Sequence, residues 1–142
     1  MPDTKVALAS HFTVEIQDAV VGRFAECSGL SVEYEILEYE EGGENRFVHR
    51  LRGRMKYPNL VLRRGVTDDQ TFQRWLFQSK DRDRRGSVTI SMLDSKATAP
   101  VRQWSFASAV PIRWVGPEIN VGENQRAMEM LEIAHEGLVP GG

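Results

Sequence analysis

The order of apolar and polar residues along the chain predicts a protein built mainly from β-strands. Several segments alternate strictly between the two residue types, and a period of two is typical of a strand that buries one face. These segments are 11–16, 32–36, 87–92 and 101–107. The last two are expected to form a hairpin connected by residues 93–100. Pro111 limits the next segment to an edge or bulged position, and the whole pattern indicates about six or seven strands.

A helix is predicted over about residues 67–80. Thr67 is followed three residues later by Gln70, which is the spacing of a capping box, and the acidic pair between them favours a helix N-terminus. Phe72, Trp75 and Leu76 then share one face at helical spacing. This apolar face is expected to cover a sheet.

The region between the second strand and the helix is less regular. The alternation changes phase at Leu37, as a bulge or the end of strand pairing would produce, and Gly42-Gly43 then permits a reversal of direction. Gly53 and Pro58 interrupt any long regular element after that turn. We therefore expect a long, partly irregular hairpin or loop between residues 41 and 65.

Residues 127–135 fit two structures. Their composition favours a helix, whereas Leu131, Ile133 and His135 alternate with other residues as in a strand. Pattern alone favours the helix. No linker or internal repeat interrupts the chain, so residues 1–142 are expected to form one domain. The predicted fold class is mainly β, with two packed antiparallel sheets forming a β-barrel or sandwich and one flanking α-helix.

Charged residues come in two adjacent blocks that the net charge of −2 conceals. The first block is acidic, the second is basic, and neither contains a residue of opposite sign. The acidic block is Glu33, Glu35, Glu38, Glu40, Glu41 and Glu44, and the basic block is Arg46, Arg50, Arg52, Arg54, Lys56, Arg63 and Arg64. Two compatible interpretations follow: neighbouring strands attract across their ladder, or one acidic and one basic surface bring identical copies together head to tail.

Composition indicates a chain that folds in water. Hydrophobic residues make up 41% and charged residues 27%, which is the balance of a globular protein. No apolar stretch approaches the roughly 20 residues of a membrane span, and the N-terminus lacks the core of a signal peptide. A lone Cys27 cannot form an intrachain disulfide. We expect synthesis in the cytoplasm without a signal peptide, and no membrane insertion of the chain.

The sequence contains no complete catalytic, metal-binding or nucleotide-binding motif. The histidines His11, His49 and His135 are scattered, Cys27 lies beside an acid, and no serine stands in a nucleophile elbow. We therefore expect no enzymatic activity, no metal and no cofactor. The basic stretch 46–64 contains aromatic residues, as a nucleic-acid site would, but the acidic block beside it argues against that function.

The ordered set of motifs resembles the tail-tube proteins of contractile bacteriophages and contractile injection systems. The resemblance spans Phe12 to Leu138. Its motifs, in order, are Phe12 to Ile16, GRFAECSGLSVEYE, EYEEGGEN, GRMKYPNLVLRRGVT, a helix with a tryptophan, PIRWVGPEIN and LEIAHEGL. One departure is Arg52 before Gly53, where relatives often carry proline. The resemblance implies that LEIAHEGL is a strand, and we adopt that prediction over the helix.

The resemblance also implies hexameric rings that stack into a hollow tube, a structural role in a phage tail or contractile injection particle. Its partners would be further copies, a sheath protein, baseplate and tube-terminating proteins, and a cargo effector or phage DNA in the lumen. Two alternatives remain open: a tube-initiating or adaptor paralogue at the baseplate, and a small β-barrel binding protein.

Two sets of residues are assigned by the same resemblance. One is expected to form inter-subunit contacts within an extended loop, and the other to face the lumen as the polar alternates of the strands. The predicted contact residues are Glu41, Gly42, Gly43, Asn45, Arg46, Arg50, Arg52, Arg54, Lys56 and Tyr57; the predicted lumen-facing residues are Glu33, Glu35, Thr89, Ser91, Gln103 and Ser105.

Overall fold

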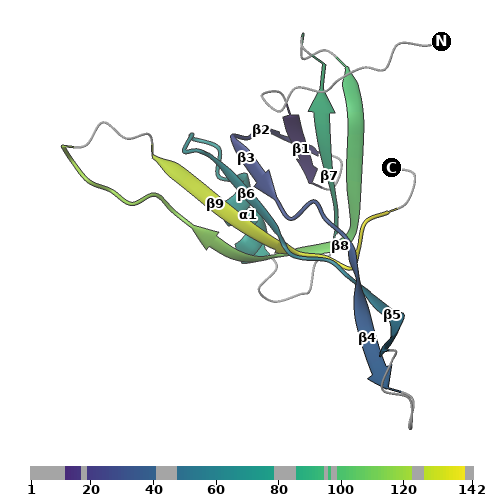
Figure 1. The fold of residues 1–142 in the computed structure, drawn as a ribbon. Helices are drawn as coiled ribbons and strands as arrows, with labels where there is room; N and C mark the ends of the chain where they lie inside the picture. The colour runs from purple at the N-terminus through teal and green to yellow at the C-terminus, as the bar shows by residue number, and fades with distance from the viewer. Residues whose placement is uncertain are drawn as a thin grey trace.

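The computed structural model describes residues 12–16, 19–40, 48–78, 86–94, 96, 99–122 and 127–139, the side chains of 19–23 and 40 apart. This part of the chain forms nine strands and one helix (Figure 1). In order they are β1 (Phe12–Ile16), β2 (Ala19–Arg23), β3 (Glu26–Ser28), β4 (Glu33–Glu40), β5 (Val48–Lys56), β6 (Leu60–Gly65), α1 (Thr71–Gln78), β7 (Gly86–Leu93), β8 (Pro100–Val115) and β9 (Met128–Ala134).

Seven strands form one folded antiparallel sheet in the order β2-β1-β7-β8-β9-β6-β3. The sixteen-residue strand β8 belongs to both halves, because its first part pairs with β7 and its last part with β9. Between these parts Ser108 has a positive φ of 50°, and the register shifts between Pro111 and Arg113. In Figure 1, β8 descends beside β7 and then turns to run beside β9. This bend folds the sheet into two layers.

The core lies between the two layers and beneath the helix. Each layer contributes the alternate residues of its strands, as the period of two predicts. Helix α1 adds Phe72 and Trp75, and the ring of Phe72 stacks on Phe24 with centroids 5.0 Å apart. The buried apolar residues are Phe12, Val14, Ile16, Phe24, Leu60, Leu62, Phe72, Trp75, Val88, Ile90, Phe106, Ala109, Leu131 and Ile133. The predicted fold class is therefore confirmed as a sandwich, because β2 and β3 stay at the edges and the sheet does not close into a barrel.

Strand β9 and the bulge in β8 confirm two sequence predictions. Residues 128–134 form a strand that pairs with β6 on one side and β8 on the other, despite their helix propensity. The register shift after Pro111 is the bulge that a proline in a strand favours. The hairpin of β7 and β8 also forms as predicted.

Other elements differ from prediction. The edge strands β2 and β3 were not predicted. Each is too short to show a clear alternation, and Gly22 and Gly29 suggested turns in this region. Gly53 does not interrupt its strand but lies inside β5. The irregularity in β4 falls between Tyr34 and Ile36 instead of at Leu37, and pairing continues to the end of the strand. The predicted turn at Gly42-Gly43 lies outside the described residues.

Helix α1 begins at Thr71, later than the predicted start at Thr67. Asp69, not Thr67, supplies the capping oxygen: its Oδ1 accepts from the Thr71 amide at 3.1 Å and from the Thr71 hydroxyl. The pKa of Asp69 is lowered mainly by the hydrogen bond from the Thr71 hydroxyl. The bond from the Thr71 amide and the nearby Arg64 guanidinium lower it further. The reason for the later start is that Asp69 is also engaged by Arg64, which keeps residues 67–70 outside the helix.

Arg64 is a buried arginine on β6 that joins three elements. Its Nε donates to Oε1 of Glu129 on β9 at 2.6 Å, and its Nη2 donates to the main-chain oxygen of Asp69 at 3.1 Å. The second Glu129 oxygen accepts from the indole of Trp114 on β8 at 3.2 Å. The guanidinium also lies 4.3 Å from the ring centroid of Phe72. These contacts fix the helix against the sheet.

We expect Arg64→Ala to lower the free energy of unfolding by about 3–5 kcal/mol, because it leaves the Glu129 carboxylate buried without its partner. The matched control is Arg63→Ala on the same strand, because Arg63 is exposed and its ion pair with Glu26 is long, at 3.8 Å. This substitution should lower the free energy of unfolding by less than about 1 kcal/mol. Urea denaturation of both variants measures the difference. If both variants lose the same free energy of unfolding, the buried pair of Arg64 and Glu129 does not stabilise the fold more than an exposed pair does.

Candidate functional site

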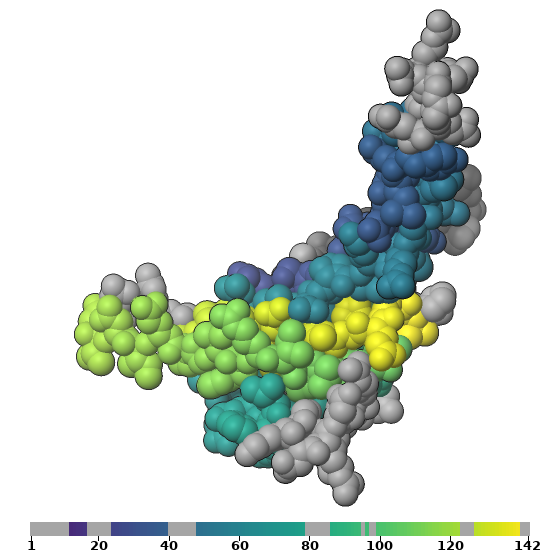
Figure 2. Space-filling view, turned by 90° about the horizontal axis from the view of Figure 1, so that it is seen from below, coloured from purple at the N-terminus to yellow at the C-terminus, as the bar shows by residue number. Residues whose placement is uncertain are grey.

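Strands β4 and β5 form a separate two-stranded antiparallel sheet, which we call the arm. The arm projects from one end of the sandwich in both views (Figures 1 and 2). Its two strands pair only with each other among the described strands. An isolated hairpin of this kind is marginally stable in water, so its length and exposure call for an explanation.

Cross-strand contacts between opposite charges and between rings hold the arm together. Glu38 lies opposite Arg50, and their side chains form an ion pair of 3.2 Å. The guanidinium of Arg52 lies 4.7 Å from the ring centroid of Tyr34, a cation–π contact. The interpretation of the two charge blocks as a cross-strand ladder is therefore confirmed for Glu38 and Arg50.

Both faces of the arm expose apolar side chains. The register places Leu37 and Leu51 side by side on one face, 50% and 52% exposed, and Ile36 on the other, 58% exposed. Further exposed apolar residues of the arm are Tyr34, Tyr39, Val48 and Met55. Monomeric proteins rarely expose contiguous apolar side chains, and patches of this kind mark interaction sites. The phase change at Leu37 was the sequence signal for this property, because it places apolar residues on both faces.

The two chain segments that enter and leave the arm, residues 29–32 and 57–59, form the arm root. The side-chain amide of Asn59 donates to Oε2 of Glu132 on β9 at 2.9 Å. His135 contacts the main-chain oxygen of Pro58 through Nε2 at 3.1 Å. The ring of Tyr57 packs edge-on against the His135 ring, with centroids 5.7 Å apart. Strand β9 and the residues after it therefore hold the arm root on the sandwich.

Two glycines allow the close packing of the arm root. Gly29 has a φ of 95°, and a Cβ there would overlap the carbonyl oxygen of Asn59. Gly137 has a φ of 134°, and a Cβ there would lie 2.9 Å from the ring of Tyr57. A side chain at either position would push the arm away from the sandwich.

The second candidate surface is the face of the sandwich opposite the core on β1, β7 and β8, which we call the polar face. Neighbouring strands bring its side chains together in rows, and two contacts join them: the hydroxyls of Thr89 and Ser105 are 3.0 Å apart, and the Gln103 amide donates to the Ser91 hydroxyl at 3.1 Å. The residues of the polar face are Thr13, Glu15, Thr89, Ser91, Gln103 and Ser105.

The structure places the predicted lumen-facing residues on two different surfaces. Thr89, Ser91, Gln103 and Ser105 lie together on the polar face, where Ser91 is almost fully buried. Glu33 and Glu35 lie instead on β4 of the arm, so the predicted set does not form one surface. Strict alternation found the first group because one side of its strands is buried; it failed on the arm, where neither side is.

The predicted contact residues that the structure describes all belong to the arm or its root. Arg50, Arg52, Arg54 and Lys56 lie on β5, and Tyr57 follows it. The others, Glu41, Gly42, Gly43, Asn45 and Arg46, lie outside the described residues. The prediction missed the apolar residues Ile36, Leu37, Val48 and Leu51, because it relied on charge. It also missed His135, whose position beside the arm root depends on a contact far apart in sequence.

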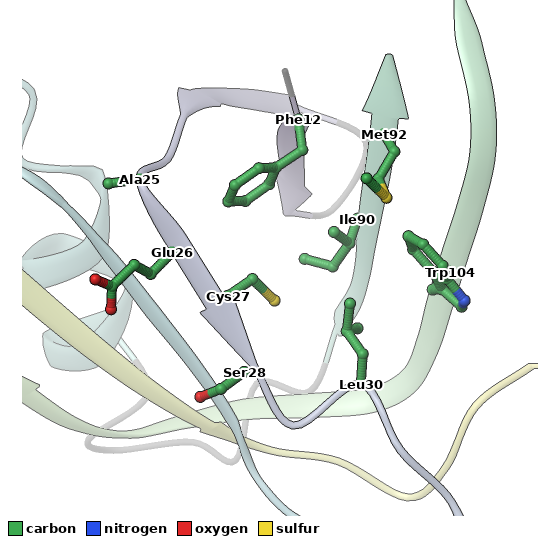
Figure 3. A pocket seen from close by; sticks show the side chains of 9 residues that line it. All are labelled: Phe12, Ala25, Glu26, Cys27, Ser28, Leu30, Ile90, Met92 and Trp104. Carbon is green, nitrogen blue, oxygen red and sulfur yellow. The ribbon is translucent and has the colours of Figure 1, made fainter. Parts of the chain in front are cut away.

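A pocket of about 390 Å³ lies between β3 and the strands β1, β7 and β8. Phe12, Cys27, Leu30, Ile90 and Trp104 point toward one another around it (Figure 3). Burial raises the pKa of the Cys27 thiol to about 11, so the thiol stays protonated at neutral pH and is a poor nucleophile. Glu26 and Ser28 also line the pocket, but their polar atoms point away from its apolar centre (Figure 3), so polar groups do not converge there as they do in a typical binding or catalytic site.

The described residues contain neither a cluster of metal ligands nor a helix that could cross a membrane. Within them, no group of three or more histidine, cysteine or acidic side chains is placed to hold a metal ion. No helix in the same ranges has the length and apolar character needed to cross a membrane.

The family profile described as T4-like virus tail tube protein gp19 matches residues 8–139. The chain belongs to this family. The resemblance seen in the sequence is thereby confirmed, and the family is a structural one and not a family of enzymes.

Solved structures share the tail tube fold over nearly the whole chain. A chain in the anti-feeding prophage baseplate, 6-fold symmetrised, is 25% identical, with a TM-score of 0.80 and 96% of each chain covered. A chain in the sheath-tube complex of the extracellular contractile injection system PVC, in its extended state, is 22% identical, with a TM-score of 0.80 over 94% of this chain and 90% of that one.

A third solved structure has the same fold. It is a chain in the tube-terminating cap of the anti-feeding prophage, 20% identical, with a TM-score of 0.82 over 98% of this chain and 93% of that one. None of the curated proteins matches the sequence.

We expect Gly29→Ala to loosen the arm of this tail tube protein, because its Cβ would displace the Asn59 carbonyl. Hydrogen exchange measures this loosening: the amides of β4 and β5 should exchange faster, and those of β1 and β7 should exchange at the same rate as in the parent chain. Gly122→Ala is the matched control: Gly122 also has a positive φ of 136°, but nothing lies within 4 Å of its added Cβ. Both variants lose about 1 kcal/mol from the backbone conformation, and only Gly29→Ala should release the arm.

Proposed function

We propose that the protein is the repeating subunit of the inner tube of a contractile injection system or phage tail, and that it forms hexameric rings that stack around a hollow lumen. The observation that carries this proposal is the arm, whose apolar residues are exposed on both faces within one subunit. A neighbouring copy covers them. The membership in the tail tube family and the 6-fold symmetrised assembly that contains a similar chain support the same arrangement.

The arm makes the contact between subunits. Its predicted contact residues are Glu41, Gly42, Gly43, Asn45, Arg46, Arg50, Arg52, Arg54, Lys56 and Tyr57, and we add the apolar residues Leu37 and Leu51. Apolar burial supplies the affinity, at about 1 kcal/mol for the exposed half of each leucine. Charges set the register, but Arg50 already has a partner in Glu38 of its own arm. Contact between copies therefore depends more on apolar area than the sequence suggested.

The polar face lines the lumen in this proposal. Thr89, Gln103 and Ser105 present hydroxyl and amide groups, and the almost fully buried Ser91 hydroxyl accepts a hydrogen bond from the Gln103 amide. Such a surface stays hydrated, and Glu15 is its one charged residue, so a polyanion or a protein can pass without adhering. Glu33 and Glu35, which lie on the arm, are assigned to the contact between copies instead. The cargo is a protein effector or phage DNA.

The other partners follow from the assembly. A sheath protein surrounds the tube, and baseplate and tube-terminating proteins bind its two ends, as the neighbours in a sheath-tube complex, a baseplate and a cap suggest. The likeness to chains in a baseplate and a cap also favours a second candidate, a tube-initiating or adaptor subunit at the end of the tube. That subunit would form rings but not stack them with its own copies.

Negative-stain electron microscopy of the purified chain at rising concentration tests the function. The first candidate predicts rings that stack into tubes, and the second predicts rings that never stack. A chain that stays monomeric at high concentration would contradict both and would favour a free binding protein.

The arm contact is tested by the double variant Leu37→Ser with Leu51→Ser. Neither side chain belongs to the core, so unfolding of the sandwich should be unchanged, while each arm loses about 2 kcal/mol of contact energy. This is about a thirtyfold weaker contact, and tubes should shorten or disappear at the concentration that assembles the parent chain. Phe77→Ser is the control, because Phe77 on α1 is 65% exposed and lies outside the arm; tubes of this variant should be normal. Normal tubes from the double variant would exclude the arm leucines from the contact.

A further inference from the structure

We propose that His135 is a positioning residue for the arm, and that the arm root is held in place only while the His135 ring is neutral. This inference rests on the proposed function for its consequence in assembly, but not for its structural part. It gives a role to the segment His135–Leu138, which belongs to the LEIAHEGL motif and lies outside the proposed contact between copies.

The contacts of His135 define one tautomer. Nε2 lies 3.1 Å from the main-chain oxygen of Pro58, and a carbonyl oxygen only accepts, so Nε2 must carry the hydrogen. Nδ1 lies 3.0 Å from the amide nitrogen of Gly137, and an amide only donates, so Nδ1 must be bare. The neutral ring therefore satisfies both neighbours. A protonated ring would point a second N–H at the Gly137 N–H.

The surroundings of the ring also favour the neutral form. The ring of Phe106 on β8 lies at a centroid distance of 4.6 Å, and the ring of Tyr57 from the arm root packs against it from another side. Burial among these groups lowers the pKa of His135, and the bond to Pro58 offsets this in part. Geometry and desolvation thus act in the same direction.

The titratable groups around His135 come from two elements. The arm root contributes Tyr57, whose hydroxyl contacts the Met55 sulfur. The segment of His135 itself contributes Glu132, which is bonded to Asn59, and Glu136. Strand β8 presents the ring of Phe106. Neither carboxylate is among the causes of the lowered pKa of His135, so burial determines the direction.

Loss of the bond between His135 and Gly137 would reach the arm directly. The Gly137 oxygen accepts from the Ala107 amide at 3.0 Å, which ties the segment to β8. The ring of Tyr57 lies against Gly137 so closely that a Cβ there would be 2.9 Å from it. A turn of the Gly137 peptide away from a protonated Nδ1 therefore moves the surface on which Tyr57 rests. Tyr57 directly follows β5, so the arm loosens with it.

The sign of the pH dependence follows from linkage. The folded chain binds the His135 proton less readily than the unfolded chain, whose histidine pKa is about 6.5. The contribution of His135 is therefore complete above pH 6.5 and is lost as the pH falls from 6.5 through the lowered pKa of the folded state. Acid should open the arm root before it unfolds the sandwich.

Hydrogen exchange of the full chain tests this inference, at a concentration too low for assembly and between pH 7.5 and 5. Protection factors correct for the intrinsic effect of pH on exchange. We expect the protection of β4, β5 and residues 57–59 to fall by about three- to tenfold, while β1 and β7 change little. The midpoint should match the titration of the His135 ring followed by NMR in the same sample.

Two variants separate His135 from other groups that titrate in this range. His135→Asn keeps an oxygen near the position of Nδ1 and cannot take a proton, so its arm should show no fall in protection. His49→Asn removes the histidine that stacks on Tyr39 within the arm itself and should keep the fall of the parent chain. A parent chain without the fall, or a fall that persists in His135→Asn, would overturn the inference.

Assembly separates this inference from the proposed function. If the arm contacts neighbouring copies, tubes of the parent chain should shorten at pH 5.5 and tubes of His135→Asn should not. If acid loosens the arm in the free subunit but leaves tube length unchanged, the role of His135 stands and the arm is not the stacking contact.

Discussion

A two-stranded hairpin has two faces and no second layer to cover either of them, and this constraint governs how the tail tube subunit is built. The arm carries apolar side chains on both faces, with Leu37 and Leu51 on one and Ile36 on the other. Burying such side chains is the main source of stability in proteins, yet the subunit leaves them exposed. In the tube that we propose, a neighbouring copy covers these side chains, and the contacts at the arm root hold the arm on the sandwich.

The sandwich provides that direction through the corner where its two layers meet. Strand β8 bends at Ser108, and the residues after β9 follow the bend, with Glu136 and Gly137 bonded to Ala107. The arm root rests on this same corner through His135 and Asn59. The direction of the arm relative to the sandwich therefore depends on a small number of contacts at this corner.

Periodicity in the sequence predicted the parts of the fold where one face is buried and the other is not. It succeeded for β1, β7 and β8, and it predicted the polar alternates of the polar face. It failed for residues 128–134, where helix propensity lost to pairing with strands on both sides, until the family resemblance decided the structure. The contacts of Arg64 with Glu129 and of His135 with Pro58 join residues 65 and 77 positions apart. No local pattern encodes such pairs, because they depend on how the sheet folds.

In the arm, charged side chains align the two strands, and apolar side chains form the exposed surface. The sequence did not show this difference. The acidic and basic blocks looked like two surfaces meant for different neighbours, but Glu38 and Arg50 are partners across one ladder. An exposed pair of this kind contributes little energy, although it fixes the register of strands that have no core to align them. This register also gives the exposed apolar side chains a defined order along the arm. Reversing the charges would thus disturb the pairing of the arm strands as well as any contact that the arm makes, so a loss of tubes in such a variant would not by itself identify a charged contact between copies.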